Sequence, residues 1–237
     1  MCYHALNRGN RRAVVFHDTE DYGAFVHLFA PASGRVSMRV LAYCLMPNHF
    51  HLVLWPRHDG DLSAWMQWLL TSYVRHYQRR FRSTGHVGQG RFKAFPIQED
   101  EHLLTVLRYV ERNPLRAGLV PSARLWPWSS LGRWQAAGGQ LIGPSGQTAG
   151  RFDAPWLVPG PVARPADGPA LVDAVMHEGE LKGVRQCVAR ERPFGAEAWA
   201  EQTAAALGLE SSLRRQGRPS ASTAARITGS ARSSQGE

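Results

Sequence analysis

Two histidines separated by one residue interrupt a hydrophobic run in "YCLMPNHFHLVLWP", residues 43–56. Because side chains alternate across a strand, His49 and His51 should share one face of a sheet and Phe50 should lie on the other. Two neutral imidazoles on one face can bind one divalent metal ion. The alternative is a pair of half-exposed strand histidines, and the short pattern alone does not separate these interpretations.

A tyrosine and an asparagine one helical turn apart could complete such a site. The stretch "DEHLLTVLRYVERN" has the apolar spacing of an amphipathic helix, with Tyr109 and Asn113 on one flank of the buried stripe. Side chains four residues apart are neighbours on a helix, so the Asn113 oxygen could be a third metal ligand with the Tyr109 phenol beside it. The alternative is a tyrosine at the edge of the core and an asparagine that ends the helix. Tyr73 and Tyr77 lie on the apolar stripe of the preceding helix, and we interpret them as core.

The elements that must position these residues follow one another in a recognisable order. Strands are expected at residues 2–9, 38–45, 49–55 and 91–98, and helices at 19–30, 61–81 and 100–113. The order β-α-β-β-α-β followed by a helix predicts an α+β, ferredoxin-like domain with an antiparallel sheet and helices on one face. The added helix would carry the tyrosine.

Composition changes near residue 130, where periodic apolar segments give way to Gly/Pro-rich sequence. We expect four regions: the ferredoxin-like domain at 1–130, a Gly/Pro-rich linker or irregular region at 131–170, a small helical C-terminal region at 171–213, and a basic, disordered tail at 214–237.

The charge of the chain favours a polyanionic partner. Lys and Arg number 28 against 19 Asp and Glu, which gives a net charge of +9. No acidic residue occurs from Ser63 to Gln98. Within that stretch, residues 75–93 hold six candidate DNA-binding residues: Arg75, Arg79, Arg80, Arg82, Arg91 and Lys93. Together they could follow a phosphate backbone, although any single one could be a solvated surface charge.

Other site classes and other compartments are disfavoured. The three cysteines are far apart and lack CxxC spacing, so they support neither a disulfide framework nor a zinc knuckle. No apolar run reaches the length of a membrane span, and the first residues lack the pattern of a secretion signal. We expect a cytoplasmic protein that does not contact membranes.

Four motifs in this order resemble one family. "AYCLMPNHFHLVL", "GHVGQGRFKAF", "LRYVERNPLRAGLV" and "WPWSS" are similar to motifs of the REP-associated tyrosine transposases, IS200-like members of the HUH-motif single-strand transposase superfamily. The resemblance covers residues 3–130. It implies that His49 and His51 bind the metal, that Tyr109 is the nucleophile, and that Asn113 is the remaining protein ligand. This mixed nitrogen and oxygen set suits Mg²⁺ or Mn²⁺, although imidazoles would also suit Zn²⁺ or Ni²⁺.

The resemblance implies a DNA transposase and endonuclease that cleaves and rejoins single-stranded or hairpin DNA through a covalent 5′-phosphotyrosine. A phenol with a pKa near 10 is a poor nucleophile at neutral pH, so a divalent metal would help by polarising the phosphate. Two alternatives remain: a non-catalytic DNA-hairpin-binding or regulatory protein, and an RNA-binding ferredoxin-like domain. The sequence leaves the oligomeric state open between a homodimer and a monomer.

Overall fold

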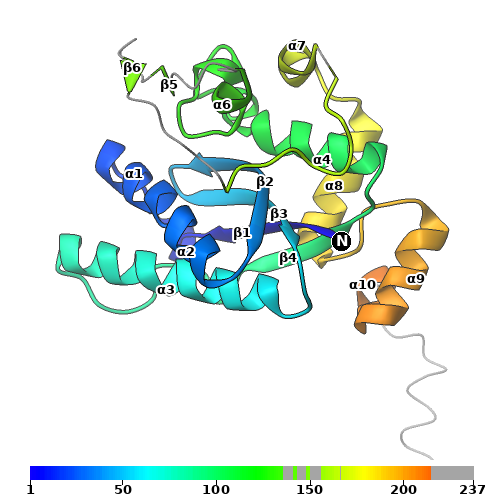
Figure 1. Ribbon diagram of the computed structural model, residues 1–237, viewed down its shortest axis with the longest axis horizontal. Coiled ribbons are helices and arrows are strands. Elements are labelled where there is room, and N and C mark those ends of the chain that lie inside the picture. The colour runs from blue at the N-terminus through cyan, green and yellow to red at the C-terminus, as the bar shows by residue number, and fades with distance from the viewer. Residues whose placement is uncertain (136–140, 143–147, 150–155, 166, 215–237) are drawn as a thin grey trace, which may run out of the picture.

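A computed structural model describes residues 1–135, 141–142, 148–149, 156–165 and 167–214. Its centre is a sheet of four strands, β1 (Cys2–Arg8), β2 (Met38–Met46), β3 (His49–Pro56) and β4 (Lys93–Ile97), shown in Figure 1. Their spatial order is β2-β3-β1-β4, and every neighbouring pair is antiparallel. This is the strand order of a ferredoxin-like sheet, so the predicted fold class is confirmed.

Three helices cover one face of this sheet, which we call the α3 face. They are α1 (Thr19–His27), α2 (Phe29–Arg35) and α3 (Asp61–Phe81). The bounds predicted for α3 are those observed. Asp18 caps α1, since its carboxylate accepts bonds from two backbone amides. The helix predicted at 19–30 instead breaks at Leu28, and α2 continues to Arg35. A short 3₁₀ helix, η1 (Asn10–Arg12), follows β1.

The added helix lies on the opposite face, which we call the α4 face (Figure 1). Helix α4 (Glu101–Glu111) buries Leu103, Val106 and Leu107 against side chains of β2, β3 and β4. The predicted helix ran to Asn113, but a proline restrains the residue before it, and Asn113 opens a separate short helix, α5 (Asn113–Arg116). Asn113 is therefore the first residue of α5, separated from α4 by Arg112 alone.

The "WPWSS" motif fixes the end of α4 to the sheet. Its Trp126 ring nitrogen donates to the Leu45 carbonyl at 2.8 Å, and the Ser130 hydroxyl donates to the buried Glu111 carboxylate at 2.7 Å. The Arg164 guanidinium donates to the same carboxylate at 2.8 Å. A buried carboxylate with two such donors is compensated, so the last turn of α4 is held in one position.

The remaining elements follow α5 in the chain. They are η2 (Ala123–Leu125), α6 (Leu131–Gln135), the strand pair β5 (Leu141–Ile142) and β6 (Thr148–Ala149), α7 (Gly168–Asp173), α8 (Glu178–Arg190), α9 (Glu197–Leu207) and α10 (Glu210–Leu213). Helix α8 packs against α4 and β4, and Trp156 and Val158 bond to the backbone of Val40 on β2. The tail expected at 214–237 lies outside the described residues, except for Arg214. None of the helices within the described ranges has the length and apolarity that crossing a membrane requires.

Candidate active site

His49 and His51 lie on the α4 face, as strand alternation predicts. Phe50, Leu52 and Leu54, the residues between and after them, belong to the core under the helices of the α3 face. The ring centres of the two histidines are 5.0 Å apart, and His51 is buried while His49 is partly exposed. The two imidazoles therefore form a compact pair at the edge of the core.

A third histidine, which the sequence analysis did not single out, joins this pair from β1. His4 is fully buried, and its Nε2 atom shares a hydrogen bond of 2.9 Å with Nδ1 of His51. The two rings are stacked with centres 5.0 Å apart. His4 Nδ1 is also buried and has no hydrogen-bond partner in the described structure. The pairing of β1 with β3 brings these rings together, and no local sequence pattern reveals that pairing.

Tyr109 meets the histidines from α4. Its ring centre lies 5.8 Å from that of His51 and 6.2 Å from that of His4, and both contacts are edge-on. Only 5% of the tyrosine is exposed. No hydrogen bond within the described part of the chain engages its hydroxyl group. The phenol of Tyr109 is thus held by packing alone, next to the histidine pair.

Asn113 and Arg116 close the site from α5. The Asn113 amide nitrogen donates to the Tyr109 carbonyl at 2.9 Å, which fixes the orientation of the carboxamide. Its oxygen accepts a 2.6 Å bond from Arg116 Nη2. The Arg116 guanidinium carbon lies 5.6 Å from the centre of the Tyr109 ring, within the range of a cation–π contact. The structure thus brings Tyr109, Asn113 and the histidine pair into one region and adds Arg116 to them.

Burial keeps the three imidazoles neutral. Burial, together with the positive charges of Arg8 and Arg116, lowers the pKa of His49 to about 4. The pKa of His51 is well below its ordinary value, and burial lowers the pKa of His4 to about 3. Neutral imidazole is the form that binds metal ions.

The hydrogen bonds of the pair suit metal binding. The Asn48 amide nitrogen donates to the Arg12 carbonyl, so its oxygen is the atom that meets His49 Nδ1 at 2.7 Å. Nδ1 of His49 must then carry the proton, which leaves a lone pair on Nε2. His51 Nδ1 is likewise occupied, by His4, and leaves Nε2 as its remaining nitrogen. With the Asn113 oxygen, the donor set fits a divalent cation. A hydrogen bond on the second ring nitrogen, which Asn48 and His4 provide here, is typical of ligand histidines.

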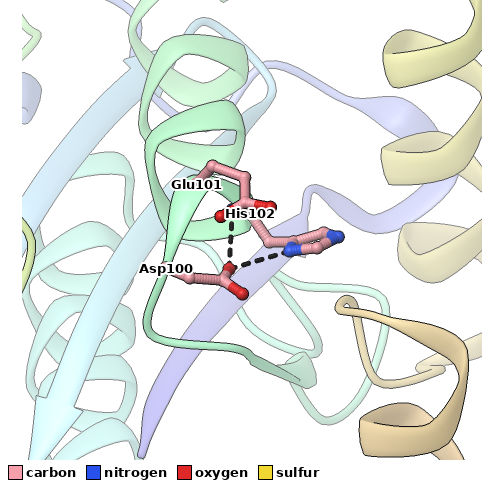
Figure 2. Close-up of side chains that lie close together, drawn as sticks. All are labelled: Asp100, Glu101 and His102. Carbon is pink, nitrogen blue, oxygen red and sulfur yellow. Dashed lines mark hydrogen bonds and ion pairs between the residues drawn. The ribbon is translucent and has the colours of Figure 1, made fainter.

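A different group of metal-binding side chains lies at the other end of α4. Asp100, Glu101 and His102 come close together there, as Figure 2 shows. Asp100 Oδ1 accepts bonds from the backbone nitrogen of His102 at 2.9 Å and from its ring nitrogen at 2.8 Å. The first of these is an N-cap contact, so the geometry of this group is explained by the start of the helix.

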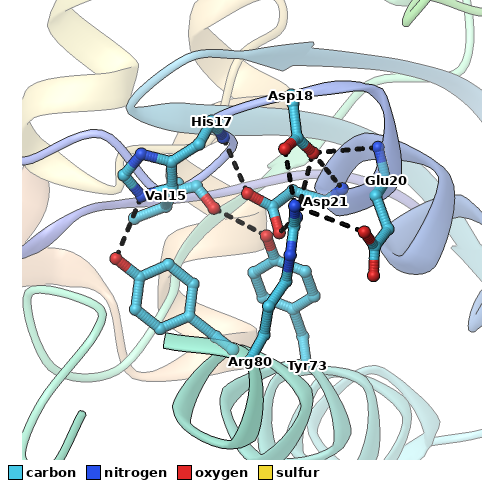
Figure 3. Close-up of polar contacts among 8 residues, drawn as sticks. Val15, His17, Asp18, Glu20, Asp21, Tyr73 and Arg80 are labelled. Atoms are coloured by element: carbon cyan, nitrogen blue, oxygen red, sulfur yellow. Dashed lines mark hydrogen bonds and ion pairs between the residues drawn. The ribbon is translucent and has the colours of Figure 1, made fainter. Parts of the chain in front are cut away.

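The six predicted DNA-binding residues fall into two groups. Arg75, Arg79 and Arg82 are exposed on or just after α3. Arg80, on the same helix, binds Asp18, Glu20 and Asp21 (Figure 3), and its hydrogen bond to Asp18 lowers the pKa of that carboxyl to about 2. Its charge is therefore compensated inside the protein.

Arg91 and Lys93 belong to the second group, which adjoins the histidines. They line a cavity of about 280 Å³ together with Arg8 on β1 and Ala189 on α8. Arg8 pairs with His49 in the register of β1 and β3, so this cavity lies beside the histidine pair. Arg8 is a second residue that the sequence analysis did not single out, because its partner is set by strand pairing.

Comparison with known proteins finds one family whose model the first part of the chain matches. Residues 1–113 match the model of the family described as IS200-like transposases. A Haemophilus influenzae protein assigned as a REP-associated tyrosine transposase is 29% identical over 104 residues, which are 39% of this chain and 58% of that protein. The chain therefore spans less than two thirds of that relative's length.

Two solved structures are also similar. One is a REP-associated tyrosine transposase bound to a REP hairpin, with 21% identity, a TM-score of 0.47, and coverage of 64% of this chain and 87% of that one. The other is a Deinococcus radiodurans protein assigned as a transposase, with 18% identity, a TM-score of 0.35, and coverage of 47% and 88%.

Proposed function

We propose that this chain, whose residues 1–113 match the model of the IS200-like transposase family, cleaves and rejoins single-stranded or hairpin DNA through a covalent bond from Tyr109 to a 5′-phosphate. One observation carries the proposal. Tyr109, on α4, lies against His51, on β3, while Asn113 bonds to the Tyr109 backbone. A nucleophile beside a metal-binding donor set is the arrangement that phosphoryl transfer requires.

The proposed reaction moves one phosphoryl group between two oxygens. The Tyr109 oxygen attacks the scissile phosphorus in line, loses its proton and forms a phosphotyrosine bond. The bond from phosphorus to the 3′ oxygen breaks, and that oxygen leaves as a free hydroxyl after it gains a proton. Attack by a 3′-hydroxyl on the phosphotyrosine reverses these steps and joins two strands.

His49, His51 and Asn113 would hold a divalent cation, with Mg²⁺ or Mn²⁺ as the proposed ions. When bound, the cation would neutralise charge that develops on the non-bridging phosphate oxygens. The protein's own contribution is to fix the donors: Asn48 and His4 orient the two imidazoles, and the Tyr109 carbonyl orients the Asn113 amide. Packing of Tyr109 against the rings limits the directions from which its oxygen can attack.

The DNA would approach along the basic residues that remain accessible. Arg8, Arg91 and Lys93 line the cavity beside His49, and phosphate contacts there would position a strand without reading its sequence. A DNA substrate also implies action in the cytoplasm.

A denaturing gel with DNA labelled at one end or the other tests this proposal. Incubation with Mn²⁺ should attach a 3′-labelled single strand to the protein, because the tyrosine would hold the 5′-phosphate of the downstream fragment. The same strand labelled at its 5′ end should give a shorter, protein-free product. DNA binding without covalent attachment would favour the non-catalytic hairpin-binding alternative instead.

A further inference from the structure

Arg116 contacts two of the residues assigned to the reaction. Its Nη2 atom donates to the Asn113 oxygen at 2.6 Å, and its guanidinium lies 5.6 Å from the centre of the Tyr109 ring. Arg116 is exposed to solvent, which means that a bound substrate could reach it.

Two neighbouring arginines, one on α4 and one directly after it, make different contacts from those of Arg116. Arg108 and Arg112 donate to backbone carbonyls of Asp173, Ala174 and Val175, at the end of α7 and just beyond it, and so tie α7 to α4. Arg116 has no carboxylate partner in the described part of the chain. An uncompensated cation that contacts the proposed nucleophile is suited to an anionic substrate rather than to holding the fold together.

We propose that Arg116 is a further catalytic residue that binds a non-bridging oxygen of the scissile phosphate. This proposal rests on the function proposed above. Its guanidinium donates to the Asn113 oxygen that a divalent cation would use. Two cations that share one amide oxygen repel each other, so binding of the metal ion would release Arg116 from Asn113. The freed N–H groups would then face the phosphate, where arginine forms strong, charge-assisted hydrogen bonds.

This competition has a signature that a structural role does not share. Removal of the guanidinium should strengthen metal binding, because a competing positive charge disappears, and should slow the reaction, because a donor to the phosphate disappears. A residue that merely holds Asn113 in place would, when removed, weaken metal binding and slow the reaction together.

The test uses the full chain and two measurements: Mn²⁺ affinity by titration calorimetry without DNA, and the rate of covalent complex formation at saturating Mn²⁺. Arg116→Ala should bind Mn²⁺ several-fold more tightly, yet form the complex about 100-fold more slowly, as expected for the loss of one preorganised donor. Arg116→Lys keeps the charge and should give wild-type Mn²⁺ affinity with part of the rate restored. Arg124→Ala, which removes an exposed charge on η2, should change neither quantity.

Three outcomes would overturn the proposal. These are weaker Mn²⁺ binding by Arg116→Ala, an unchanged rate at saturating Mn²⁺, or an absence of Mn²⁺ binding in both wild type and Arg116→Ala. Failure of the proposed function is distinguishable, because a wild-type protein that binds Mn²⁺ but forms no covalent complex would refute the reaction itself. The Mn²⁺ titrations would then still report whether Arg116 competes for the Asn113 oxygen.

Discussion

Tyrosine, histidine and arginine side chains gather on both faces of the central sheet. On the α3 face, the Tyr73 hydroxyl donates to the Val15 carbonyl at 2.6 Å, as Figure 3 shows. The Tyr77 hydroxyl and His17 Nε2 lie 3.1 Å apart, within hydrogen-bond distance, and Arg80 binds three carboxylates. Each of these groups has a partner within the protein.

The α4 face holds the same residue types in a different state. The Tyr109 hydroxyl has no hydrogen-bond partner among the described residues, and the Nε2 atoms of the histidine pair are the nitrogens left for a ligand. Arg116 contacts Asn113 and Tyr109 but no described carboxylate. The comparison shows that residue type does not identify a reactive group. What distinguishes the α4 face is that the Tyr109 hydroxyl and the Nε2 atoms of His49 and His51 are held in place without a hydrogen-bond partner among the described residues.

Replacing one tyrosine on each face with phenylalanine should give the largest difference in effect between the two faces. Tyr109→Phe removes the proposed nucleophile and should lower covalent attachment to DNA by roughly 1,000-fold or more, while the free energy of unfolding changes little. Tyr73→Phe should leave attachment intact but lower the free energy of unfolding by about 1–3 kcal/mol, because the buried Val15 carbonyl loses its donor. The gel assay and denaturant unfolding measure the two effects. Loss of attachment in Tyr73→Phe with normal attachment in Tyr109→Phe would reverse the assignment.

The proposed metal ligands should behave as one unit. His49→Ala, His51→Ala and Asn113→Ala should each raise the Mn²⁺ concentration needed for half-maximal cleavage by at least about 10-fold, since even the outer partners of metal ligands cost that much. The two histidine changes should have larger effects than Asn113→Ala. The effect of a double variant should be smaller than the sum of the effects of its two single variants, because ligands of one ion act together. Cleavage should be measured against Mn²⁺ concentration.

Chelation provides the control for those variants. Chelator should stop cleavage by the wild-type protein but spare most DNA binding, which the exposed basic residues would supply independently. Cleavage that persists in excess chelator would show that the reaction does not need the metal ion.

The smallest predicted effects are those of two adjacent arginines of α3 on DNA binding. Arg79→Ala should weaken binding of every DNA sequence by a few-fold and lower the salt slope by about 1, as expected for one phosphate contact. Arg80→Ala should weaken DNA binding less but lower the thermal stability more, because buried Asp21 would lose its ion-pair partner. Filter binding at several salt concentrations and thermal unfolding distinguish them. Equal salt slopes for both variants would contradict the distinction.

Periodicity in the sequence predicted the order of strands and helices along the chain, the bounds of α3 and the shared face of His49 and His51. These features depend on local patterns of apolar residues, which repeat along each element. The assignment of Tyr109 used the same kind of pattern together with the family resemblance, and its role stays a prediction.

Features that depend on contacts between distant segments were missed. His4 and Arg8 acquire their roles only when β1 pairs with β3, more than 40 residues later in the chain. Arg80 lies near Asp18 and Asp21 only because α1 and α3 pack together, so its compensation is invisible in the acid-free stretch where it occurs. Arg116 follows Pro114, where helical periodicity is interrupted, and so no stripe could place it beside Tyr109.

Identification of the residue that carries the DNA tests the central claim most directly. Covalent complexes formed with a short single strand can be digested with nuclease and trypsin and examined by mass spectrometry. Because Arg108 and Arg112 flank the proposed nucleophile, trypsin should release residues 109–112 with a nucleotide attached to Tyr109. A nucleotide on the peptide that contains Tyr73 or Tyr77 would contradict the account, because it would place the reaction on the α3 face.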